Sequence, residues 1–236
     1  VQTSVVTGQP FYQIIRQVIR DQHDMVIMTA DGQQDLRHQF LGTTAMHLMR
    51  KCLCPLWVVK PSRRNQIRKV LAAIDPSEDR TARNCLNAEI LKRASYICRT
   101  QKAEFHVIHT WNPAAGKVKQ SRRWMSRTES RLYAEQIAAD HRSRLEESLH
   151  LAGCRHAKVH LIRGNAAEVI AQTADRENVD LLVMGTVCRT GIPGFYIGNT
   201  AETVLNMVSC SVLTAKPIDF ECPVQIVDNE DLATTG

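Results

Sequence analysis

The stretch with the clearest chemical potential is residues 184–202, MGTVCRTGIPGFYIGNTAE. It begins at the end of an apolar segment and finishes at an expected helix start. Gly185 permits a tight turn and lets a ligand approach the backbone closely. Gly198, Asn199 and Thr200 would place free N–H groups, and the positive end of a helix dipole, where an anion can sit. This pattern is typical of a loop that holds phosphate.

Asp75 ends a second apolar segment, residues 69–75, KVLAAID. If both segments are parallel strands, its carboxylate faces the same crevice and can accept hydrogen bonds from a ribose or a base. Two alternatives need no ligand. Asp75 can cap the following helix, and Asn199 with Glu202 three residues later fits a capping box.

Other side chains give a weaker indication of chemistry. His106 and His109 fall on one expected strand with no third ligand in view, so we expect no metal site there. The sequence contains no nucleophile–base pair, G-x-S-x-G motif or Walker A lysine motif. It therefore makes no case for an enzyme, and weak ATP hydrolysis is the most that we expect.

The chain has eight cysteines, but none of them forms a C-x-x-C pair. Several fall in apolar stretches, where a reduced cysteine behaves as a small hydrophobe. Reduced thiols favour the cytosol. No apolar run approaches the roughly 18 residues of a membrane span, and no secretion signal opens the sequence. We therefore expect a cytoplasmic protein with no membrane partner.

The formal net charge of +6 is unevenly spread. A basic stretch over residues 117–131, with Trp124 inside it, could attract nucleic acid. Since no nucleic-acid-binding motif accompanies it, we interpret the stretch as a solvated linker and a charged helix face. Nucleic acid is not an expected partner.

An alternation of strands and helices must position these residues. We expect strands over residues 69–75, 104–111, 157–162, 180–184 and 211–216. The helices expected between them cover about 82–97, 126–151, 166–177 and 200–207. This alternation predicts an α/β fold with a doubly wound parallel sheet and a ligand site outside the strand carboxyl ends.

The chain also repeats itself. When it is shifted by 156 residues, residues 3–61 align with residues 159–217 without a gap. Gly42 then meets Gly198, and Cys54 meets Cys210. Such self-similarity indicates duplication. We predict the C-terminal part of a first domain in 1–61, a linker in 62–68, a complete second domain in 69–217 and an acidic tail in 218–236.

These motifs resemble the universal stress protein family. The resemblance is carried by the opening KVLAAID, by Gly185-Thr-Val-Cys188, nine residues and Gly198-Asn199-Thr-Ala-Glu202, and by C-x-x-x-x-K-P at the last strand. It covers about residues 1–61 and 66–217. The duplication and the acidic tail most resemble the tandem-domain E-type members, with a first domain that lacks its N-terminal part in this chain.

The resemblance implies a five-stranded parallel sheet of order 3-2-1-4-5 and a role in the cytoplasmic stress response. It also implies that domains pair, within or between chains, through their last strands, residues 56–60 and 211–216. With its first two strands absent, the first copy would hold residues 1–10 poorly.

Some members of the family bind ATP and others do not. In those that do, the first-strand aspartate and a residue at the end of strand two hold the nucleoside, while the glycine loop and the helix start hold the phosphates. The positions that this implies here are Asp75, Thr110, Gly185, Thr186, Cys188, Gly198, Asn199 and Thr200.

This sequence departs from the family pattern at several positions. Cys188 stands where the family has its second glycine, so its Cβ would narrow the phosphate loop. Asn199 replaces the usual Ser or Thr. In the first copy Thr29 replaces the first glycine, and the aspartate-bearing strand is absent, so that copy cannot form a complete site.

Two functional hypotheses follow. The first is a stress-response binding protein whose second domain takes ATP or a related adenine nucleotide, with Mg²⁺. The alternative is an interaction module that uses no nucleotide and acts through domain pairing and contacts with proteins or small ligands. Cys188 and the incomplete first copy favour the alternative.

Overall fold

The computed structural model describes residues 1–30, 42–61, 66–76, 82–112, 126–186, 198–217 and 220–224. The strands are β1 (Val26–Thr29), β2 (Leu56–Val59), β3 (Lys69–Ala73), β4 (Glu104–Trp111), β5 (Lys158–Arg163), β6 (Leu181–Gly185) and β7 (Ser211–Ala215). The helices are α1 (Pro10–Asp21), α2 (Gly42–Lys51), α3 (Ala82–Gln101), α4 (Arg127–Leu151), α5 (Ala166–Arg176) and α6 (Asn199–Met207). The basic residues 117–123 lie outside the described part of the chain.

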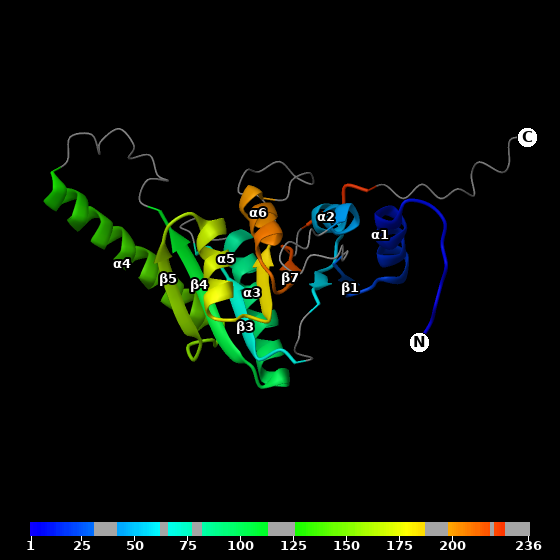
Figure 1. Cartoon of the computed structure of the whole chain (residues 1–236), viewed down its shortest axis with the longest axis horizontal. Helices are drawn as coiled ribbons and strands as arrows, with labels where there is room; N and C mark the ends of the chain where they lie inside the picture. Colours follow the sequence, from blue (N-terminus) through cyan, green and yellow to red (C-terminus); the bar gives the residue numbers. More distant parts are fainter. Residues whose placement is uncertain are drawn as a thin grey trace, which may run out of the picture.

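The strands form one sheet in the order β1-β2-β7-β6-β3-β4-β5 (Figure 1). Its last five strands are parallel and follow the order predicted for the second copy. The expected five-stranded sheet is thus part of a seven-stranded one. The two additional strands come from the first copy, with β2 antiparallel to β7 and β1 parallel to β2.

The junction between β2 and β7 joins the last strands of the two repeats within the chain. Leu56 lies opposite Thr214, and Val58 lies opposite Val212. The buried Thr214 hydroxyl accepts a hydrogen bond from the Leu56 N–H at 3.3 Å and donates one to the Leu56 carbonyl at 3.2 Å. This pairing merges the first and second copies into one sheet. Their division into two domains therefore stays a prediction.

Helices cover the sheet on both sides. Val70 and Ala72 of β3 pack in one core with residues of α3 and α4, such as Leu91 and Leu145. Leu71 points the other way, into a core shared with α1, α2, α5 and α6. Burial on both faces explains why the strands of the parallel part are almost continuously apolar.

Capping side chains fix where α4 and α5 begin. Ser126 caps α4 in a capping box with Glu129. Asn165 caps α5 by accepting hydrogen bonds from the backbone N–H groups of the first turn. Residues 1–9 form no helix or strand and are exposed, as expected for a poorly held segment.

In the described ranges, no helix combines the length and the apolar character that crossing a membrane requires.

Candidate functional site

Three predicted site residues lie at the same edge of the sheet. Ala73 of β3 lies opposite Ile108 of β4 and opposite Met184 of β6. Two residues further along each chain segment stand Asp75, Thr110 and Thr186. Because the strands are parallel and in register, these residues lie at the carboxyl edge, where α/β sheets bind ligands.

The backbone of Asp75 is held by α3. Its N–H donates to Asn87 Oδ1 at 3.1 Å, and Asn87 Nδ2 donates to the Asp75 carbonyl at 3.0 Å. The Asp75 carboxylate remains accessible, since 39% of the side chain is exposed. The position after β3 is therefore rigid, while the carboxylate can still reach solvent or a ligand.

Gly185 is the last residue of β6, and its predicted part in the loop that follows stays a prediction. A Cβ atom at this position would lie 2.7 Å from Leu86 Cδ2 of α3. A side chain at this position would therefore require the Leu86 side chain, which packs α3 against β6, to shift.

Among the described residues, no side chain caps the start of α6. Gly198 is the N-cap residue, and Asn199 is the first helical residue. The capping-box alternative is therefore wrong, because the Glu202 carboxylate instead pairs with Arg50 of α2 at 3.2 Å. The Asn199 and Thr200 side chains are exposed, so the first turn offers N–H groups and the positive end of a helix dipole.

Comparison with known proteins gives the family. The model of the Universal stress protein family matches residues 1–60 and 66–216. The chain belongs to this family. The Universal stress protein E of Escherichia coli K12 is 28% identical over 225 residues, which are 95% of this chain and 70% of that protein. The Universal stress protein E homolog of Haemophilus influenzae is 23% identical over 205 residues, 86% of this chain and 65% of that protein.

Solved structures agree with the fold. The crystal structure of PA1789 from Pseudomonas aeruginosa PAO1, a protein of unknown function, gives a TM-score of 0.74 at 27% identity and covers 90% of this chain and 70% of that chain. A universal stress protein from Archaeoglobus fulgidus gives a TM-score of 0.58 at 19% identity, covering 89% of this chain and 67% of that chain. The α/β architecture is thus that of universal stress proteins.

In this universal stress protein, the loop between β6 and α6 is closed at its base. The Gly198 N–H donates to the Thr186 carbonyl at 2.9 Å. The Thr186 hydroxyl is buried and has no hydrogen-bond partner among the described residues. Cys188 lies outside the described residues, so its predicted effect on the loop stays a prediction. The closure brings the start of α6 to the edge that carries Asp75.

A histidine pair next to Asp75 is a feature that the sequence analysis missed. His109 of β4 is buried, and its Nδ1 lies 3.1 Å from the Ile74 carbonyl and 3.9 Å from Asp75 Oδ1. A carbonyl can only accept, so the proton of a neutral His109 sits on Nδ1. Its Nε2, 2.7 Å from His141 Nδ1, then accepts from that ring.

His141 comes from the middle of α4, and no sequence signal links it to His109. Burial, and then the charge of Arg144, lower the pKa of His141, which favours the neutral ring. A hollow of about 490 Å³ in the described surface lies away from this edge. It lies between α3 and the end of α4 and is lined by residues such as Lys92, Arg99 and His156. The carboxyl edge thus combines an accessible carboxylate, the His109–His141 pair and a helix start that no described side chain caps.

Proposed function

We propose that this chain is a stress-response binding protein that takes ATP, or a related adenine nucleotide with Mg²⁺, at the carboxyl edge of β3, β4 and β6. The observation that carries the proposal is the common register of Ala73, Ile108 and Met184, two residues beyond which Asp75, Thr110 and Thr186 follow on their segments. It is joined by the start of α6, which the Thr186–Gly198 hydrogen bond holds nearby.

The proposed site divides the nucleotide between two kinds of group. Asp75, an acceptor, would take hydrogen bonds from ribose hydroxyls or the base, with Thr110 beside it on β4. The N–H groups of Asn199 and Thr200 would hold phosphate oxygens, since a helix N-terminus attracts anions, while the Gly198 N–H keeps its bond to Thr186. Gly185 would act indirectly by seating α3. The proposal assigns binding and includes no catalytic step.

The test is isothermal titration calorimetry of the full chain with ATP and Mg²⁺. We expect Asp75→Asn to weaken ATP at least about tenfold, because hydrogen bonds to a charged group contribute roughly 1.5–3 kcal/mol. The control is Glu135→Gln on the exposed face of α4, which keeps wild-type affinity. Adenosine and inorganic triphosphate, titrated separately, report the two halves of the site.

The outcomes separate the hypotheses. If Asp75→Asn binds ATP as tightly as wild type, the site assignment is wrong. A Cys188→Gly variant tests the loop, since binding by this variant alone would mean that the cysteine closes the pocket. If neither wild type nor Cys188→Gly binds ATP, the alternative holds, and the chain is an interaction module that uses no nucleotide.

A further inference from the structure

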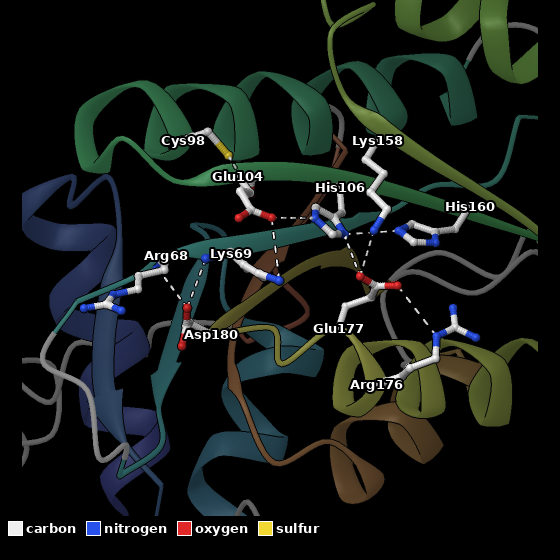
Figure 2. Close-up of polar contacts among 10 residues, drawn as sticks. All are labelled: Arg68, Lys69, Cys98, Glu104, His106, Lys158, His160, Arg176, Glu177 and Asp180. Atoms are coloured by element: carbon white, nitrogen blue, oxygen red, sulfur yellow. Dashed lines mark hydrogen bonds and ion pairs between the residues drawn. The ribbon is translucent and has the colours of Figure 1, made fainter.

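A second polar cluster lies away from the carboxyl edge, near the amino ends of β4 and β5 (Figure 2). His106 is the third residue of β4, and His160 is the third residue of β5. Glu177 is the C-cap residue of α5. The sequence analysis found no third ligand beside His106 and His109, whereas the structure places two other possible ligand groups next to His106. The other two ligands come from elements that begin more than fifty residues later in the sequence.

The ligand atoms of these three residues converge. His106 Nδ1 lies 3.1 Å from His160 Nε2 and 4.0 Å from Glu177 Oε2. One atom from each residue lies within 4.8 Å of the other two. Around a tetrahedral ion with bonds of about 2.0–2.1 Å, neighbouring ligand atoms stand roughly 3.3–3.4 Å apart. Only a small adjustment would therefore admit an ion.

The two histidines of the cluster are buried, and a neighbouring carboxylate orients the ring of His106. His106 is 2% exposed and His160 is 8% exposed. The second nitrogen of His106, Nε2, lies 3.4 Å from Glu104 Oε2. A carboxylate there holds the proton on Nε2 and leaves the Nδ1 lone pair directed at His160 and Glu177. Outer carboxylates orient metal-binding histidines in this way.

Without a metal ion, two positively charged side chains pair with the negative charge of Glu177. Lys158 Nζ lies 2.9 Å from Glu177 Oε2, and Arg176 Nε lies 3.6 Å from Oε1. The Lys158 side chain is 60% exposed, so it can turn to solvent when another cation takes its place. In the ion-free state the two imidazoles share one hydrogen bond, and an ion would replace that shared proton.

We propose that His106 Nδ1, His160 Nε2 and Glu177 Oε2 bind a divalent transition-metal ion of the Zn²⁺ type, with water completing its coordination. Two imidazoles and one carboxylate match the ligand preference of Zn²⁺ rather than that of Mg²⁺ or Ca²⁺. The site lies near the opposite ends of the strands from Asp75 and does not depend on nucleotide binding. A bound ion would tie the end of α5 to β4 and β5.

The test uses metal ions alone with the full chain. Zn²⁺ affinity is measured by competition with a chromophoric chelator, and the ligand type is read from the absorption spectrum of the Co²⁺ form. We expect one equivalent of metal with nitrogen and oxygen ligands. Glu177→Gln should weaken Zn²⁺ by more than about tenfold, and Lys158→Met should tighten it, because the competing ammonium is gone.

The matched control is His141→Gln, which removes one ring of the other histidine pair and leaves this cluster intact. It should bind Zn²⁺ as wild type does. The proposal is overturned if Glu177→Gln keeps wild-type affinity or if wild type binds no stoichiometric Zn²⁺. Thiolate-to-cobalt charge-transfer bands would also overturn it, because they would place the ion on cysteines.

Discussion

Lys60 and Lys216 make reciprocal contacts across the junction of β2 and β7. Lys60 Nζ donates to the carbonyl of Val208, the C-cap residue of α6, at 2.5 Å. Lys216 Nζ donates to the carbonyl of Met49, in the last turn of α2, at 2.6 Å. Both side chains are buried. Each repeat therefore places a cation at the negative end of a helix from the other repeat.

The first prediction concerns the pH dependence of stability. Burial lowers the pKa of Lys216 to about 8, below its usual 10.5. Between these two values the unfolded chain binds more protons than the folded one, so deprotonation favours the fold as pH rises. We expect wild type to gain stability relative to Lys216→Met from about pH 8 to 10.5, by up to about 1.4 kcal/mol per pH unit.

The measurement is urea denaturation of both proteins across this range. The cysteines titrate in both chains, so the difference between the two curves reports the lysine together with its charge interaction with Cys52. A Lys92→Met control, at a position that is 79% exposed, should show no such trend. A constant or falling difference for Lys216→Met would contradict the burial argument.

The second prediction concerns Gly185 and Leu86. Gly185→Ala puts a Cβ atom 2.7 Å from Leu86 Cδ2, and overpacking of this kind costs about 1–3 kcal/mol of unfolding free energy. In a Leu86→Ala background the same substitution should cost much less, because the contact is gone. Denaturation of the four proteins gives the coupling energy. A cost that is equal in both backgrounds would show that the glycine matters for another reason.

The third prediction tests the β2–β7 junction. Thr214→Val keeps the shape of the side chain but removes the hydroxyl that both accepts from and donates to the backbone of Leu56. Leaving these buried groups unpaired should cost about 1–3 kcal/mol in thermal or urea unfolding. Thr203→Val on the exposed side of α6 is the matched control, where the effect should stay within about 0.5 kcal/mol.

The fourth prediction concerns thiol reactivity. The Cys54 thiol, 3.6 Å away, lowers the pKa of Cys52 to about 7, which would normally make Cys52 reactive. Both thiols are buried, whereas Cys85 is exposed. We therefore expect iodoacetamide to modify Cys85 at least about tenfold faster than Cys52 in the native protein, as followed by peptide mass spectrometry. In urea the two rates should become similar; equal native rates would mean that the Cys52 region opens readily.

The sequence predicted most of what is set by local pattern. The strand expected over residues 104–111 is β4 with the same limits, and the helix expected over about 126–151 is α4, which begins one residue later at Arg127. The strand order of the second copy followed from the family resemblance. Apolar periodicity and capping act within a few residues, so one sequence suffices to identify them.

Long-range contacts explain what the sequence did not predict. His106 meets His160 and Glu177 only because β5 pairs with β4 and α5 ends beside them. Glu202 leaves its expected capping position because Arg50, from the other repeat, offers a charge partner. Gly185 packs closely against Leu86, a residue about a hundred positions earlier. In each case the deciding partner is close in space and far away in sequence.

The core on one face of the sheet continues across the junction of β2 and β7. It contains Ile15 and Leu48 from the first repeat together with Ile170 and Leu205 from the second. Since neither group can lose its packing without exposing the other, the repeats behave as one cooperative folding unit. Heating or urea should therefore produce a single melting transition, in which the smaller segment depends on the larger for its fold.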